Sequence, residues 1–164
     1  MIVSPADHLV SDVAEFEKDI ETAIERTSNS DKLLTLGIKP HRPDTGYGYI
    51  HFDELSEGKA CPVINFTEKP PLEKAKEFVA SGNYYWNSGI FIWSYNNIDA
   101  ALSKYLPSMS NIFIEGKEYY NSPEERSFVD ENFPKCESIS IDYGIMEKSD
   151  KVEMLKTDFG WSDL

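Results

Sequence analysis

Two carboxylates near opposite ends of the chain are the first candidates for chemistry. Asp7 follows the apolar residues of MIVSPADH, and Asp163 is the next-to-last residue, in DFGWSDL. Hard cations such as Mg²⁺ take carboxylate oxygens and share their remaining coordination positions with phosphates. Acids from two distant strands could therefore hold one metal from two sides. Asp7 could instead cap a helix, Asp163 could be an ordinary polar residue, and Asp158 is an alternative second acid in the same segment.

A second group of residues suits a phosphorylated sugar. FTEKP places Glu68 and Lys69 at the expected end of a strand. A carboxylate can accept hydrogen bonds from paired hydroxyls, and an ammonium meets a phosphate as a point charge. In DTGYGY, Gly48 would let a ligand approach the backbone, and Tyr47 could flank a sugar or a base. Asn87, in WNSGIF, offers both a donor and an acceptor to a hydroxyl.

Each of these motifs also has a plainer interpretation. Adjacent Glu and Lys are often solvated, DTGYGY could be a glycine-containing loop, and Asn87 could form an Asx turn. In SIDYGIMEKS, Asp142 is expected to cap a short helix. The sequence contains no GxGxxG, P-loop or GxSxG motif, which argues against those nucleotide and hydrolase sites. The histidines lack metal-ligand spacing with cysteine or with one another; they are His8, His41 and His51.

The elements that must position these side chains follow from hydrophobic periodicity. Residues 12–27 have apolar side chains at helical spacing, with Ser11 or Asp12 as the expected cap. Residues 32–38 read as a buried strand, so strand, helix and strand predict a βαβ unit. The chain is therefore expected to be α/β, with a mainly parallel sheet flanked by helices. Ligands bind outside the carboxyl ends of strands in such sheets, where these motifs are expected to meet.

The rest of the chain continues the alternation of strands and helices. Residues 63–69 and the second half of 83–94 are predicted strands, and two or three helices are expected within 96–132. A helix over 72–81 is bounded by Pro71 and Gly82.

Composition sets limits on the class of protein. A length of 164 residues, 40% of them hydrophobic, is enough for one packed domain. The formal charge of −13 argues against nucleic acid as a partner, since backbone binding needs clustered cations. No apolar run is long enough to span a membrane. Cys61 and Cys136 stand far apart with no CxxC, as is typical of reduced thiols, which predicts a cytoplasmic protein.

Taken in order, the motifs resemble those of the sugar-1-phosphate nucleotidyltransferases over essentially the whole chain. They are SPADH, DTGYGYI, FTEKP, WNSGIF, SIDYGIMEKS and DFGWSDL. WNSGIF and SIDYGIMEKS favour the mannose/GDP branch over the glucose/dTDP and UDP branches. The resemblance implies a Rossmann-like, glycosyltransferase-A-like fold. It also implies transfer of GMP from GTP to mannose 1-phosphate, with Mg²⁺ as cofactor. A different sugar-1-phosphate nucleotidyltransferase and a non-catalytic α/β binding module are the alternatives.

The resemblance also implies roles for individual residues. Asp7 and Asp163 would be the catalytic acids that hold Mg²⁺ from its two sides. Glu68 would bind sugar hydroxyls and Lys69 the sugar phosphate. The remaining residues of the sugar site would be Tyr47, Gly48 and Asn87.

One part of the family pattern has no counterpart in this sequence. The family's domain begins with a strand and a glycine-rich loop that contains an arginine, followed by a Pro-Lys pair, and these bind the nucleotide. Residues 1–164 are therefore expected to form a single partial domain, truncated at its N-terminal nucleotide-binding part, without turnover by itself. A sheet edge exposed in this way favours self-association, so a homodimer is expected.

Overall fold

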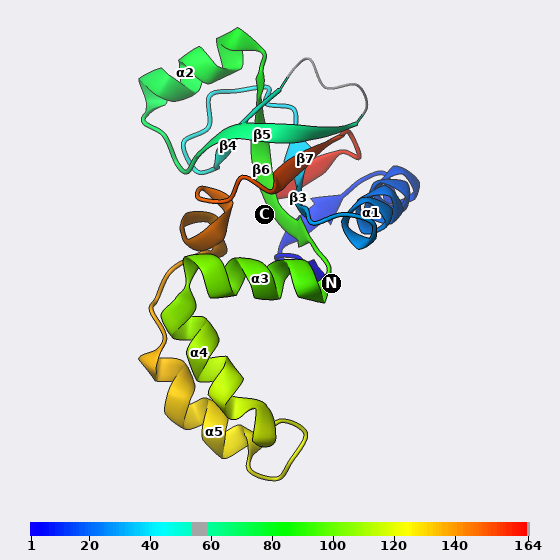
Figure 1. Cartoon of the computed structure of the whole chain (residues 1–164). Helices are drawn as coiled ribbons and strands as arrows, with labels where there is room; N and C mark the ends of the chain where they lie inside the picture. Colours follow the sequence, from blue (N-terminus) through cyan, green and yellow to red (C-terminus); the bar gives the residue numbers. More distant parts are fainter. Residues whose placement is uncertain (54–58, 164) are drawn as a thin grey trace.

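The main sheet is the centre of the computed structural model, which describes residues 1–53 and 59–163. Within these residues, six strands pair in the order β1-β6-β3-β7-β5-β4 (Figure 1). Their bounds are β1 (Ile2–Val3), β3 (Leu33–Ile38), β4 (Tyr49–Phe52), β5 (Ala60–Thr67), β6 (Tyr84–Ile92) and β7 (Val152–Thr157). A separate pair joins β2 (His8–Val10) to β8 (Trp161–Asp163).

The sheet is mixed, and the prediction of a mainly parallel sheet is wrong. Among the described strands, β3 and β7 are the one parallel pair, and the other pairings are antiparallel. The strands β1 and β3 do run in the same direction, but β6 lies between them. Because Trp86–Ile92 is largely buried, β6 can occupy this central position as well as a strand from a βαβ unit could. The predicted α/β class, with helices flanking a sheet, is confirmed.

The strand register explains why the motifs meet at one edge. Since β4 also pairs with β6, one row of paired residues crosses five strands: Thr157, Ile38, Trp86, Tyr49 and Thr67. The strands β3, β5 and β7 end at this row, while β4 and β6 begin at or near it. The loops that carry DTGYGY and FTEKP and the start of WNSGIF therefore share one edge of the sheet.

Helices cover both faces of the sheet (Figure 1). On one face lie α1 (Val13–Ser28) and α2 (Leu72–Ser81), and on the other lie α3 (Tyr95–Tyr105) and a short π-helix, η3 (Asp142–Met146). Two buried clusters result, because successive side chains of a strand point to opposite faces. The first contains Leu34, Leu36, Ile92, Ala23, Ala75 and Phe78. The second contains Leu33, Phe91, Met154, Ile98, Ala101 and Ile145.

The helix ends follow the predicted capping signals. Asp12 accepts a hydrogen bond from the backbone N–H of Glu15 at 3.0 Å, which confirms it as the cap of α1. Helix α2 ends at Gly82, whose φ of +80° is the left-handed conformation that favours glycine. These local signals fixed both helices to within a residue of their predicted ranges.

Two further helices form an arm that projects from the sheet (Figure 1). They are α4 (Pro107–Glu115) and α5 (Glu125–Asn132), and with α3 they make three α-helices where two or three were predicted. Phe128 stacks on Tyr119 with ring centroids 5.0 Å apart. It also covers Gly116, where a Cβ would collide with the ring. The arm thus has an aromatic contact of its own, remote from the edge where the motifs meet.

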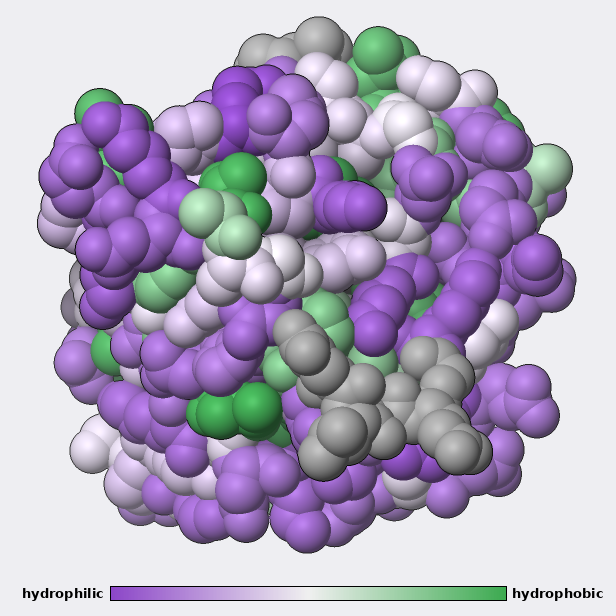
Figure 2. All heavy atoms as spheres, turned by 90° about the horizontal axis from the view of Figure 1, so that it is seen from above, coloured by the Kyte–Doolittle hydropathy of each residue, from purple (hydrophilic) through white to green (hydrophobic). Residues whose placement is uncertain are grey.

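One face of the molecule is predominantly polar. Figure 2 shows a face that is largely hydrophilic, with apolar atoms confined to small separate spots. No helix in the described part of the chain is long and apolar enough to cross a membrane.

Candidate active site

The two predicted metal acids meet although they are far apart in the sequence. Antiparallel pairing of β2 with β8 places His8 opposite Asp163, and Asp7 directly precedes β2. Asp7, His8 and Asp163 each offer one ligand atom within 4.8 Å of the others. Both carboxylates are exposed. Asp158 is also exposed and does not belong to this group, so the structure brings Asp163 and not Asp158 to Asp7.

The sequence did not indicate His8 as a neighbour of the acids, because its proximity to Asp163 depends on strand pairing and not on its spacing from a cysteine or another histidine. The Nε1–H of Trp161 donates to Nδ1 of His8 at 3.2 Å, and the two rings meet edge to face. Since an indole can only donate, this bond assigns the proton of the neutral imidazole to Nε2. Neither nitrogen then has an unused lone pair for a metal. The donor set left for a cation is the two carboxylates, which fits a hard ion such as Mg²⁺.

Replacing Trp161 by phenylalanine is expected to change the metal preference of this group. The variant keeps an aromatic ring beside His8 but removes the N–H, so Nδ1 of His8 becomes available as a ligand. Imidazole suits Ni²⁺ and Zn²⁺ and adds little for Mg²⁺. Calorimetry should therefore show about tenfold tighter Ni²⁺ binding with nearly unchanged Mg²⁺ binding. The double variant Trp161→Phe/His8→Ala should lose the gain, and a gain that survives this change would contradict the assignment.

Tyr47 connects the acid pair to the predicted sugar site. Its ring lies 5.2 Å from that of Trp161 and 5.1 Å from that of Trp86, measured between centroids. Burial raises the pKa of the Tyr47 hydroxyl, and the nearby charge of Asp163 raises it further. Tyr47 therefore contacts the strand that carries one acid while belonging to the loop before β4.

Gly48 joins the three motifs of the sugar site through its backbone. Its carbonyl oxygen accepts from the backbone N–H of Asn87 at 2.8 Å, and the preceding carbonyl, of Tyr47, accepts from the N–H of Lys69 at 3.2 Å. A Cβ at Gly48 would collide with the carboxylate of Glu68 and would lie 3.2 Å from ring carbons of Phe66. The absence of a side chain is thus required for the position of Glu68.

Glu68 and Lys69 border a cavity of about 600 Å³. This volume lies within the usual range of small-ligand sites, roughly 300–1,000 Å³. Nζ of Lys69 lies 3.7 Å from Oε1 of Glu68, and Lys69 is mostly exposed. The φ of Lys69 is +45°, an uncommon conformation for a residue with a side chain. The other lining residues are Glu137, Ser138, Ile139, Ser140, Asp142 and Tyr143.

Asn87 is buried and bonds to Asp142. Its Oδ1 accepts from the hydroxyl of Thr35 at 2.8 Å and from the backbone N–H of Gly89 at 3.3 Å. Its Nδ2 donates to Oδ1 of Asp142 at 3.0 Å. The expectation that Asp142 caps a helix is wrong, since Ile141 holds the cap position and the Asp142 carboxylate is bonded to β6. Asp142 is thus a site residue that the sequence did not indicate.

Two carboxyl groups in this cavity have raised pKa values. Burial raises the pKa of Glu68 above its ordinary value of 4.5, the charge of Asp142 adds to this, and Lys69 partly opposes it. Burial likewise raises the pKa of Asp142, against the hydrogen bond from Asn87. Partly buried carboxyl groups with perturbed pKa values beside a cavity are typical of ligand-binding sites.

The variant Glu68→Gln is expected to be more stable than the wild type at neutral pH. The folded-state pKa of Glu68 is raised, so its contribution to stability is fully present below about pH 4.5 and is lost as pH rises through the folded-state pKa. Removing the ionisable group removes this loss. The difference in the free energy of unfolding between Glu68→Gln and the wild type, measured with urea, should shrink as pH is lowered toward 4.5. A difference that does not change with pH would contradict this account.

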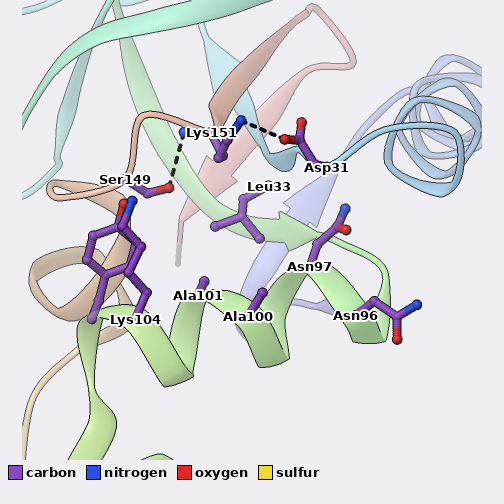
Figure 3. A pocket seen from close by; sticks show the side chains of 10 residues that line it. Asp31, Leu33, Asn96, Asn97, Ala100, Ala101, Lys104, Ser149 and Lys151 are labelled. Atoms are coloured by element: carbon purple, nitrogen blue, oxygen red, sulfur yellow. Dashed lines mark hydrogen bonds and ion pairs between the residues drawn. The ribbon is translucent and has the colours of Figure 1, made fainter.

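A smaller cavity, of about 200 Å³, lies at the other end of the parallel strands (Figure 3). Leu33, at the start of β3, forms part of its lining together with residues of α3. Several of its polar groups are paired with one another or with the backbone: Lys151 lies 2.6 Å from Asp31, and Nδ2 of Asn97 bonds to backbone carbonyls, including that of Lys32 at 2.9 Å. The candidate site is therefore the cavity at the carboxyl ends, as expected for an α/β sheet.

The fold and this site together define a class. The nucleotidyl transferase family model matches residues 1–164, and the chain belongs to this family. It is 37% identical to the mannose-1-phosphate guanylyltransferase of Escherichia coli K12, over 100% of this chain and 35% of that protein. It is 35% identical to mannose-1-phosphate guanylyltransferase RfbM of Salmonella typhimurium LT2, over 100% of this chain and 34% of that protein. The predicted resemblance is confirmed.

A solved structure supports the fold in the same way. It comes from Thermus thermophilus and is described as a mannose-1-phosphate "geranyltransferase". The TM-score is 0.84 at 31% identity, covering 99% of this chain and 45% of that one. The chain spans about a third of the length of the two curated relatives from Escherichia coli and Salmonella.

Proposed function

We propose that this chain supplies the sugar-phosphate side of a mannose-1-phosphate guanylyltransferase. The reaction transfers GMP from GTP to mannose 1-phosphate and gives GDP-mannose and pyrophosphate. The observation that carries the proposal is one edge of the sheet. There, a cavity bordered by Glu68 and Lys69 is linked through Tyr47 to the acids Asp7 and Asp163. Two relatives that are 35–37% identical over the whole chain are both named mannose-1-phosphate guanylyltransferase. This shared name supports mannose 1-phosphate as the sugar substrate.

Each residue has a separate task in the proposed reaction. Lys69 binds the sugar phosphate, and Glu68 accepts hydrogen bonds from sugar hydroxyls. An oxygen of the bound phosphate attacks the α-phosphorus of the nucleotide, and pyrophosphate leaves as the new P–O bond forms. Phosphoryl-type transfer depends mainly on alignment and charge neutralisation. Asp7 and Asp163 would hold Mg²⁺, which when bound neutralises phosphate charge.

The proposal is tested first by ligand binding to the 164-residue chain. Calorimetry in the presence of Mg²⁺ should show tighter binding of mannose 1-phosphate than of glucose 1-phosphate or mannose. Lys69→Ala should abolish the binding, while the matched control Lys117→Ala, an exposed lysine outside the cavity lining, should not. A preference for glucose 1-phosphate would favour another branch of the family. Absence of heat with every sugar phosphate would favour a non-catalytic binding module.

The nucleotide is tested with the complete gene product. GTP should support pyrophosphate release in preference to dTTP, UTP and CTP, and preference for another nucleotide would overturn the guanylyl assignment. The 164-residue chain by itself should have no turnover, since its sequence lacks the glycine-rich loop with an arginine. Robust pyrophosphate release by this chain would contradict that expectation.

Further expectations complete the proposal. Residues 1–164 would form a single partial domain, the sugar-phosphate-binding portion of the enzyme, in a cytoplasmic protein that acts on small molecules. A homodimer stays a prediction, and sedimentation of the purified chain would test it.

A further inference from the structure

We infer that Asp142 binds a sugar hydroxyl directly, and that Thr35 and Asn87 position its carboxylate without contacting the sugar. This inference rests on the proposed function and adds a recognition residue to it. It also reverses the order expected from the sequence, in which Asn87 was the sugar ligand and Asp142 a helix cap.

The amide of Asn87 has one orientation in this hydrogen-bond network. The backbone N–H of Gly89 can only donate, and it lies 3.3 Å from Oδ1 of Asn87. The carboxylate of Asp142 can only accept, and it lies 3.0 Å from Nδ2. The Thr35 hydroxyl, fully buried, lies 2.8 Å from the same Oδ1 and 3.2 Å from the carbonyl of Ile90. Donor and acceptor ends of the amide are therefore distinguished.

This orientation leaves Asn87 little capacity for a ligand. Its side-chain oxygen faces the Gly89 N–H and the Thr35 hydroxyl, whose one hydrogen also lies within reach of the Ile90 carbonyl. One of its two N–H groups is directed at Asp142, and the residue is 9% exposed. Its role is thus to hold the Asp142 carboxylate in place from the sheet.

Asp142, by contrast, borders the cavity and retains acceptor capacity. It lines the cavity together with Glu68 and Lys69. A carboxylate can accept about four hydrogen bonds, and the one side chain that donates to Asp142 within the described residues is Asn87. The cavity therefore presents the carboxylates of Glu68 and Asp142, with the exposed Glu137 at its border, for hydroxyl groups, and the Lys69 ammonium for an anion. This set of groups suits a polyol that carries an anionic group, and the acids would repel a simple anion.

Calorimetry with mannose 1-phosphate and Mg²⁺ tests the inference. Asp142→Ala should weaken sugar-phosphate binding about tenfold or more, as expected for loss of a hydrogen bond to a charged acceptor. Mg²⁺ binding should not change. Thr35→Val, which removes the hydroxyl but keeps the shape, should weaken sugar-phosphate binding a few-fold, roughly the effect of one neutral hydrogen bond. Thr35→Ser keeps the hydroxyl and should restore most of the affinity.

Deoxy sugars identify the contact itself. One monodeoxy analogue of mannose 1-phosphate should bind the wild type more weakly than mannose 1-phosphate does. The same analogue should bind Asp142→Ala with the same affinity as mannose 1-phosphate. Such non-additivity is the mark of a direct contact. If every deoxy analogue loses the same factor in both proteins, Asp142 does not touch the sugar and the inference is wrong.

The outcomes separate this inference from the proposed function. Wild-type affinity in Asp142→Ala, with binding lost in Lys69→Ala, would overturn the inference and leave the proposed function standing. Absence of sugar-phosphate binding by the wild type would overturn both. If Asp142→Ala does not fold, Asp142→Asn carries the test. The side-chain oxygen of the asparagine can still accept from Nδ2 of Asn87, so this variant should fold. Because it lacks the negative charge of the carboxylate, it should bind the sugar phosphate more weakly.

Discussion

Replacing Gly48 by alanine is expected to lower the affinity for mannose 1-phosphate by at least about 100-fold, equivalent to losing two charge-assisted hydrogen bonds. The added methyl group would occupy the space of the Glu68 carboxylate and press on the ring of Phe66. Glu68 would have to leave its position, and Lys69, which bonds through its backbone to the same loop, would be displaced with it. Calorimetry with mannose 1-phosphate measures the effect.

Two controls distinguish this collision from general damage to the loop. Gly46→Ala adds the same methyl group two residues away, where the nearest atom is a side-chain oxygen of Asp44 at 3.1 Å. This variant should keep nearly full affinity. In a Glu68→Ala background the closer of the two neighbours is absent and only the ring of Phe66, at 3.2 Å, remains, so Gly48→Ala should have a much smaller further effect. Wild-type affinity in Gly48→Ala, or equal losses in both glycine variants, would contradict the role given to Gly48.

Local signals made the helices predictable from sequence, and long-range pairing made the sheet unpredictable. Asp12 and Gly82 mark helix ends through contacts within a few residues, so α1 and α2 follow from the sequence alone. The position of β6 between β1 and β3 depends on pairings between residues some 50 to 90 positions apart. An apolar strand buried on both faces has the same pattern in a parallel and in a mixed sheet.

The candidate site shows the same division. Asp7, Asp163, Glu68 and Lys69 stand in motifs at strand ends, so their types and places indicated chemistry. The Asn87–Asp142 hydrogen bond joins a strand to a helix start 55 residues later, and an aspartate at a helix start looks like a cap. The proton on Nε2 of His8 likewise follows from a bond to Trp161, 153 residues away. Such contacts follow from strand register, which a single sequence does not state.

Replacing Asp163 by asparagine is expected to weaken Mg²⁺ binding by about 100-fold, because the ligand charge at a hard-cation site sets much of its affinity. The group has two carboxylates, and the nearby histidine is held by Trp161, so nothing replaces the lost charge. Asp7→Asn should have a similar effect, and the double variant should show no detectable Mg²⁺ binding. Calorimetry, with Mn²⁺ relaxation enhancement as a second probe, measures the loss.

Asp158→Asn is the matched control, since Asp158 is exposed in the same segment but stands outside the acid group. It should leave Mg²⁺ affinity unchanged, and an equal loss would mean that general negative charge, not coordination, attracts the ion. Asp163→Asn should also leave mannose 1-phosphate binding in the absence of Mg²⁺ unchanged, as Gly48→Ala should leave Mg²⁺ binding unchanged. Tyr47 touches the strand of Asp163 as well as the sugar loop. If either variant changed the binding of the other ligand, the ring of Tyr47 would couple the metal acids to the sugar cavity.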